Sequence, residues 1–432
     1  MCFQNGNSPA LGENPLKHAR SLSLLVTLVL FIEGSFLAPA VLSLNTTSQT
    51  IQSYGEILSL PPPIPNPQLR VNGLYLADGL GNQVKLKGVI ADWNERVKKY
   101  GTTQLANSPE ESWFTESDVV RIKEAGGNCI EIHQLNLPEL MPTRNVPNEA
   151  YFATWIDKYV AWCSQNGVYC ILDINSIGAR WDWEIALTYP NWLWQGIYSQ
   201  PTTQTQYDDI LKDFFDLSVT KQDVNRQAFI NLWTYIANRY KDDPYVMFSI
   251  INEPFIGTYY MHSDVATYLG QSYSNYMTII IDAIRSTGAQ QIVIVNKPYL
   301  WNIPWSLTVE RIDRSNIVWE DHVYVEGGSN NLNNWFKVEI DKAVQKFVTG
   351  FQQPLFIGEY GFDPKNVIRT DYPTTWRQIL ADEVAYLDSK PLAGRQWHSW
   401  GHINGEYYPF ESPDISNLTA EESEYIIQTV MG

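Results

Sequence analysis

The chain has 432 residues, with 30 Lys and Arg against 47 Asp and Glu, which gives a formal net charge of −17. This acidic balance disfavours a nucleic-acid binder, whose affinity depends on basic side chains that neutralise phosphate. The composition, 44% apolar and 18% charged, is that of a globular protein rather than a disordered or coiled-coil one, and its 16 Trp, 25 Tyr and 16 Phe favour partners that are partly polar and partly apolar, such as sugar rings.

The first 44 residues are predicted to be a targeting segment. Lys17 and Arg20 precede a long apolar run, and the small residues Ala38 and Ala40 fit the cleavage site of a signal peptide. We expect this leader to be cleaved. The protein would then be secreted.

A retained membrane anchor is the alternative for the same segment. The stretch 21–44 is nearly long enough to span a bilayer, although Glu33 interrupts it. In that case the folded part would face the outside of the cell. Residues 45–68 are rich in Thr and Pro and lack a packing pattern, so we expect a linker there.

From residue 69 to residue 432 the sequence predicts one α/β domain. Short β-rich runs alternate with helical patterns, such as the apolar spacing from Phe229 to Tyr240 and the capping pair Thr115 and Asp118. The strands are predicted at 83–90, 128–134, 169–175, 245–252, 291–296, 317–324, 354–359 and 394–400.

Eight such units favour a closed (β/α)8 TIM barrel, because closure leaves no sheet edge. An open doubly wound sheet is the alternative. Residues 69–80 are expected to form a small N-terminal hairpin that closes the barrel floor. Cys129, Cys163 and Cys170 lie in apolar runs and are expected to be buried thiols, with a Cys129–Cys170 bridge as the alternative.

Acidic side chains stand where two of these strands end. Glu253 follows the fourth strand and Glu359 ends the seventh, and reactive groups of a barrel gather at the carboxyl ends of its strands. Two carboxylates about 5 to 5.5 Å apart are what retaining glycoside cleavage requires, one as acid and the other as nucleophile. We therefore expect Glu253 and Glu359 to face each other across the barrel mouth.

Three motifs carry a resemblance to a known family: Asn252-Glu253-Pro254, His322-Val323-Tyr324 and Gly358-Glu359-Tyr360-Gly361. With them the chain resembles glycoside hydrolase family 5, the cellulase family, over roughly residues 69–410. The resemblance implies that Glu253 is the acid/base, Glu359 the nucleophile and Asn252 a donor to the sugar 2-hydroxyl. It also implies that His322 and Tyr324 flank the two carboxylates, and that Trp400, or Trp397, forms an aromatic floor.

The chain departs from the family pattern at two positions. Glu131 stands where the family has Arg on the second strand, and Asn175 stands where it has His after the third. An added carboxylate should raise the pKa of Glu359 unless a cation compensates. His133 shares the strand parity of Glu131 and could face the same pore. Candidate counter-charges are Arg180, Lys297 and Arg395.

Aromatic residues after several strands are candidates for sugar stacking. Trp93 follows the first strand and Trp181 follows the third, where it begins a long aromatic loop. No metal or nucleotide motif is present in the sequence, and hydrolysis of this kind needs only the protein and water, so no cofactor and no metal is expected.

The sequence thus predicts a monomeric, retaining, endo-acting β-glycanase that acts by double displacement. The expected partner is a polysaccharide, with β-1,4-linked glucan ranked first and β-mannan as the alternative. A carbohydrate-binding pseudoenzyme is the second alternative, because Glu131 and Asn175 depart from the family pattern.

Overall fold

The computed structural model describes residues 66–91, 114–175, 191–201, 203–257, 263–300, 309–324, 332–362, 375–403, 406–408 and 419–432. The predicted leader at 1–44 and most of the linker at 45–68 lie outside these residues. Within the described ranges, none of the helices combines the length and the apolar character needed to cross a bilayer.

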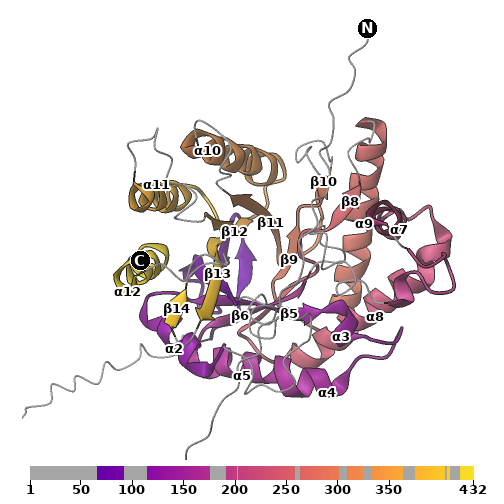
Figure 1. Ribbon diagram of the computed structural model, residues 1–432, viewed down its shortest axis with the longest axis horizontal. Helices are drawn as coiled ribbons and strands as arrows, with labels where there is room; N and C mark the ends of the chain where they lie inside the picture. The colour runs from indigo at the N-terminus through magenta and orange to yellow at the C-terminus, as the bar shows by residue number, and fades with distance from the viewer. Residues whose placement is uncertain are drawn as a thin grey trace, which may run out of the picture. The chain divides into compact units, whose positions relative to one another are not determined.

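Eight parallel strands close into a barrel, as the sequence predicts (Figure 1). They follow one another around the barrel in chain order, and β12 pairs with both β11 and β13, so the ring is complete. All eight predicted strands are present, and the open-sheet alternative is excluded. The barrel strands are β4 (Leu86–Ala91), β5 (Cys129–Asn136), β6 (Tyr169–Asn175), β7 (Val246–Ser249), β9 (Val293–Asn296), β11 (Ile317–Tyr324), β12 (Leu355–Gly361) and β13 (Gly394–Ile403).

Helices surround these strands on the outside (Figure 1). The helix that starts at Glu116 begins with the predicted capping box, in which the Thr115 N–H donates to the Asp118 carboxylate. The helical segments are α2 (Glu116–Glu124), α3 (Leu137–Leu140), α4 (Glu149–Tyr151), α5 (Asp157–Asn166), α7 (Gln204–Phe215), α8 (Asp223–Tyr240), α9 (Ser263–Ser286), α10 (Leu332–Ala343), α11 (Trp376–Asp388) and α12 (Ala420–Met431), with short turns at Phe152–Ile156, Asn191–Leu193, Thr220–Gln222 and Val344–Gly350.

Alternation along each strand divides the core into two parts. On β5, Ile130 and Ile132 join the large apolar core shared with the helices, whereas Cys129 joins a smaller core inside the barrel. On β6, Cys170 belongs to the outer core and Tyr169 to the inner one. Cys129 and Cys170 therefore lie on opposite faces of the sheet. This excludes a bridge between them, and Cys129, Cys163 and Cys170 are buried free thiols, as expected.

A small antiparallel sheet closes one end of the barrel, as predicted for residues 69–80. Its strands are β1 (Arg70–Asn72), β2 (Tyr75–Ala77) and β3 (Gln83–Val84), and Gly73, with φ 64°, turns the chain between the first two. Leu69 and Leu76 pack into the apolar core inside the barrel. The end of the barrel with the amino termini of its strands is thus filled by apolar side chains, and polar groups are left to the other end.

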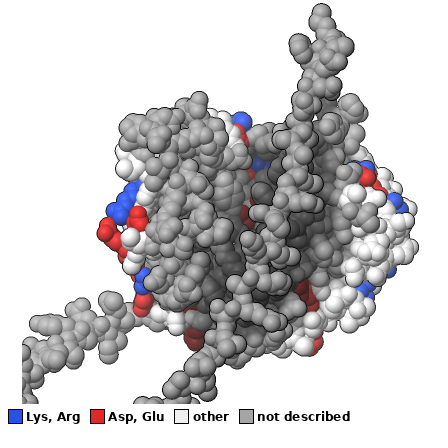
Figure 2. Space-filling view, viewed as in Figure 1, with Lys and Arg blue, Asp and Glu red and all other residues white. Residues whose placement is uncertain are grey.

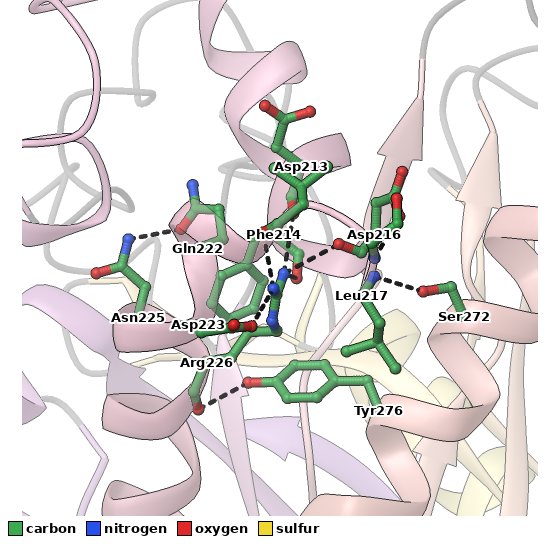
Figure 3. Close-up of polar contacts among 12 residues, drawn as sticks. Asp213, Phe214, Asp216, Leu217, Gln222, Asp223, Asn225, Arg226, Ser272 and Tyr276 are labelled. Atoms are coloured by element: carbon green, nitrogen blue, oxygen red, sulfur yellow. Dashed lines mark hydrogen bonds and ion pairs between the residues drawn. The ribbon is translucent and has the colours of Figure 1, made fainter.

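A buried arginine anchors α7 next to the strand that follows Glu253. Arg226, in α8, donates to the carbonyl oxygens of Asp213, Phe214 and Asp216, each at 3.1 Å, and so caps the carboxyl end of α7 (Figure 3). The Leu217 N–H is held by the Ser272 hydroxyl of α9 at 2.8 Å. Helix α7 contacts β8 (Phe255–Gly257), which pairs in parallel with β10 (Tyr299–Leu300). The cap therefore supports the segment that leaves the mouth of the barrel.

Candidate active site

Glu253 lies just beyond β7 in a left-handed backbone conformation. Its φ is 39°, a region that non-glycine residues rarely occupy. The preceding Asn252 is anchored by its N–H, which donates to the Ile174 carbonyl oxygen at 2.9 Å. The Asn252 Oδ1 atom is buried and has no hydrogen-bond partner within the described residues. Outliers of this kind concentrate at functional sites, where the surrounding structure holds the strained geometry in place.

A β-bulge in β12 aims Glu359 into the barrel. Asp321 of β11 pairs with Ile357, but the next residue, His322, pairs with Glu359, so Gly358 is an extra residue in the ladder. A bulge shifts the alternation of side chains by one position, which turns the next side chain to the other face. Glu359 is a buried residue, 4% exposed, and its carboxylate accepts a hydrogen bond from the Tyr324 hydroxyl.

The two glutamates converge on His322. Its Nδ1 atom lies 2.9 Å from Glu253 Oε1 and 3.3 Å from Glu359 Oε2. One carboxylate oxygen of each glutamate and one ring nitrogen of His322 all lie within 4.8 Å of one another. The side chain of Glu253 is 34% exposed, whereas that of Glu359 is only 6% exposed. One carboxylate is therefore open to an incoming group and the other is enclosed.

Burial alone would lower the pKa of His322, but the surrounding carboxylates reverse this effect. Glu359, Glu253 and Glu320 together raise the His322 pKa well above its ordinary value, which favours the cationic form of the ring. The family has an arginine on the second barrel strand, where this chain has Glu131. His322, on the sixth barrel strand, offers a positive charge beside Glu359 instead.

Glu320 is a member of this site that sequence reasoning missed. It lies below His322 on β11, and its Oε1 atom is 3.5 Å from His322 Nε2. Its Oε2 atom accepts hydrogen bonds from Asn296 Nδ2 at 2.5 Å and from the Ser249 hydroxyl at 3.4 Å. The signal in the sequence was its strand parity, because Glu320, His322 and Tyr324 are two residues apart and share one face.

Glu131 lies inside the barrel, where it is 1% exposed. Burial, followed by the charges of Glu320 and Glu359, raises its pKa well above the ordinary value, and the neighbouring His322 and His398 offset this only in part. These effects favour the neutral form of the Glu131 carboxyl. In this form it adds no negative charge beside Glu359.

Two of the counter-charges considered for Glu131 have other ionic partners. Lys297 Nζ lies 2.6 Å from Asp321 Oδ1. Arg395 forms two hydrogen bonds with Asp388, at 3.1 and 3.0 Å, and also donates to the Tyr360 hydroxyl. Arg180, the third candidate, lies outside the described residues.

The ring that β13 directs toward the site is His398, which corrects the expectation of a tryptophan there. His398 packs edge-on against Tyr324, with ring centroids 5.9 Å apart. Trp397 packs instead against Tyr360 and Phe362 in the outer core, and Trp400 Nε1 donates to Asp118 of α2 at 3.0 Å. The pairing of β13 with β4 shifts register between the two tryptophans, which decides these directions.

Trp93 and Trp181 lie outside the described residues, as do the side chains of His133 and Asn175.

On the face shown in Figure 2, described Lys and Arg side chains lie among Asp and Glu at the rim, so neither sign of charge dominates there.

Glu253, His322 and Glu359 have a spacing that a divalent cation could also use. A histidine binds a metal through a neutral ring nitrogen, however, and the surrounding carboxylates favour the protonated form of His322. The donor set therefore fits a metal poorly.

Comparison with known proteins agrees with this geometry. The model of the family described as Cellulase (glycosyl hydrolase family 5) matches residues 93–402. This match spans most of the chain, and the protein therefore belongs to glycosyl hydrolase family 5. It is a glycosidase with a TIM-barrel fold. No curated protein matches the chain.

Solved structures with the same fold include three enzymes. Endo-glycoceramidase II from Rhodococcus sp. shares 18% identity over 79% of this chain and 80% of its own, with a TM-score of 0.60. An endogalactoceramidase shares 17% identity over 84% of both chains, with a TM-score of 0.59. An endo-beta-1,4-glucanase from Xanthomonas axonopodis pv. citri shares 18% identity over 80% of this chain and all of its own, with a TM-score of 0.52.

Proposed function

We propose that the protein is a retaining, endo-acting β-glycanase in which Glu359 is the nucleophile and Glu253 the acid/base. The observation that carries the proposal is the approach of the two carboxylates, whose oxygens lie within 4.8 Å of each other across His322. Retaining enzymes need about 5 to 5.5 Å between the two groups, whereas inverting ones need about 6.5 to 9.5 Å to admit a water molecule. The short separation favours double displacement.

The two environments suit these roles. Glu359 is enclosed, accepts a hydrogen bond from Tyr324 and lies 3.3 Å from His322 Nδ1, and both contacts stabilise a charged nucleophile. It attacks the anomeric carbon and forms a glycosyl ester while the leaving oxygen takes a proton from Glu253. The more exposed Glu253 then takes a proton from water, whose oxygen attacks the anomeric carbon and releases Glu359. The Oδ1 atom of Asn252, which has no hydrogen-bond partner in the part of the chain that the structure describes, supports a role for this amide in holding a sugar hydroxyl.

The nature of the glycan is part of the proposal. We rank β-1,4-linked glucan first and β-mannan second, as in the sequence-based expectation. The likeness to endo-glycoceramidase II and to an endo-beta-1,4-glucanase adds glycolipids to the substrates worth testing. Product analysis on soluble β-glucan, β-mannan and a glycolipid in detergent would rank these three. We further propose that the mature protein is a monomer, secreted or anchored outside the cell.

Azide rescue tests both roles at once. Replacing Glu359 with Ala should abolish hydrolysis, and added azide should then give a glycosyl azide of inverted configuration. Replacing Glu253 with Ala should give an azide of retained configuration, because the nucleophile remains. The expected loss without azide is at least about 10³-fold, in the range of removing an essential acid or base.

A matched control for these variants is Glu383→Gln, which removes a buried carboxylate far along the chain in α11. It should keep full activity. Unchanged hydrolysis in Glu359→Ala would refute the proposed role. Glycan binding by wild type, with no reducing ends released between about pH 4 and about pH 8, would favour the pseudoenzyme alternative.

A further inference from the structure

The contacts of His322 favour a proton on each ring nitrogen. Nδ1 faces the oxygens of Glu253 and Glu359, and Nε2 lies 3.5 Å from the Oε1 atom of Glu320, an ion-pair contact rather than a hydrogen bond. A carboxylate only accepts hydrogen bonds, and a neutral imidazole can donate from one nitrogen only. Because Glu359 lies on the Nδ1 side and Glu320 on the Nε2 side, the imidazolium form suits this arrangement even when Glu253 carries the proton that it donates in catalysis.

Glu320 is held in place by three other strands. Asn296 of β9 and Ser249 of β7 donate to its Oε2 atom, which leaves Oε1 for His322. Gly358 of β12 supplies the space, since a Cβ at this position would lie 1.5 Å from Glu320 Oε1 and 2.4 Å from its Cδ. The glycine that forms the bulge before Glu359 is thus also the glycine that accommodates Glu320.

We propose that Glu320 is a positioning residue that keeps His322 protonated and oriented between the two catalytic glutamates, in place of the arginine that the second strand lacks. Glu320 does not reach the mouth, because it is 1% exposed and lies beneath the ring. It acts through His322, whose positive charge stabilises an ionised Glu359. This inference rests on the proposed function for its meaning in catalysis.

Several titratable groups share this environment, and all must be considered in a measurement of His322. The described groups that interact with its ring or with its direct partners include Glu131, Glu253, Tyr273, Glu320, Tyr324, Glu359 and His398. After burial, the charge of Glu320 is the largest cause of the raised pKa of Glu131. Removing the charge of Glu320 should therefore lower the His322 pKa and also ease the ionisation of Glu131.

Nitrogen NMR of the full-length protein, with labelled histidine, tests the proposal without need of turnover. The His322 signals are assigned by their loss in His322→Asn. In wild type, both ring nitrogens should stay protonated from about pH 5 to about pH 8, a range that spans the ordinary histidine pKa. In Glu320→Gln, which keeps an acceptor but removes the charge, the ring should lose its proton at least about one pH unit earlier, a tenfold change in the equilibrium.

The control is again Glu383→Gln, which should leave the His322 titration unchanged. A wild-type His322 with one unprotonated nitrogen at neutral pH would overturn the proposal, as would a Glu320→Gln titration equal to that of wild type. If Glu320→Gln does not fold, the wild-type titration alone decides. In Glu320→Gln, the alkaline limb of the pH profile of kcat/KM should shift to lower pH, together with the pKa of His322. An inactive wild type with a cationic His322 would refute the proposed function and leave this inference standing.

Discussion

Glu253 combines a reactive side chain with a strained backbone. Its φ of 39° places a side chain with a Cβ in a region that favours glycine. Replacing Glu253 with Gly should relieve this strain, whereas Glu253→Ala keeps it. We expect both variants to be inactive. The free energy of unfolding of Glu253→Gly should be about 1 kcal/mol larger than that of Glu253→Ala.

Denaturant unfolding of the two variants measures this difference directly. Asn316 offers a comparison away from the mouth, because its backbone is also left-handed, with φ 56°. Its side chain accepts a hydrogen bond from the Val71 N–H, so this residue has a structural role rather than a catalytic one. Equal stability of the Gly and Ala variants at position 253 would show that the left-handed backbone stores no strain.

Individual residues show how far sequence reasoning reaches. The Glu253 and Glu359 motifs predicted two carboxylates at one mouth, and the structure brings them together. Glu320 could have been found from its parity with His322. His398 could not, because a register shift within β13 decides which of three neighbouring residues faces inward. A single extra residue in a strand reverses every later side chain, and no local propensity marks where it occurs.

At the level of elements, the cap on α7 depends on one guanidinium. Arg226 is 3% exposed, serves four backbone carbonyls and pairs with Asp223 at 2.5 Å. Arg226→Met should lower the free energy of unfolding by about 3 to 5 kcal/mol, because these buried carbonyls would lose their donor. Arg226→Lys should also be costly, since an ammonium cannot match the planar fork.

Asp223→Asn is the matched control for these variants. The Asp223 side chain is 61% exposed, and an ion pair at such a site contributes at most about 1 kcal/mol. Urea unfolding of the three variants checks the order. Since α7 contacts the strand after Glu253, Arg226→Lys should also lose activity at temperatures where it remains folded. A Lys variant as stable as Asp223→Asn would contradict this account.

The order of elements was predictable because barrel strands are short, apolar on both faces and separated by helical periodicity. All eight appear where the alternation indicates. The cap by Arg226 gave no such signal, because its acceptors are backbone carbonyls on another helix, and sequence carries no mark of a contact made by main-chain atoms.

For the molecule as a whole, buried acids make stability depend on pH. Both carboxylate oxygens of Glu383 are buried and lack hydrogen-bond partners within the described residues. Burial and the nearby Asp382 raise its pKa well above the ordinary value, with a small opposing effect from Lys337. The folded state therefore binds a proton that the unfolded chain releases above about pH 4.5, so this group destabilises the fold as pH rises.

Glu383→Gln should accordingly be more stable than wild type at neutral pH. Each unit by which the pKa is raised corresponds to about 1.4 kcal/mol. The advantage should vanish below the ordinary glutamate pKa, where the carboxyl is neutral in both states. Thermal unfolding of both proteins, measured from about pH 4 to about pH 8, would show curves that converge on the acid side. Parallel curves would mean that Glu383 is solvated.

Gly358 and Glu320 also restrict how this enzyme can diverge. A methyl group on the backbone at 358 would occupy the space that the Glu320 side chain now fills. A descendant that acquires alanine at 358 must therefore move or lose the acid at 320, and with it the support of the imidazolium. Alanine at 358 should be better tolerated once a smaller residue stands at 320.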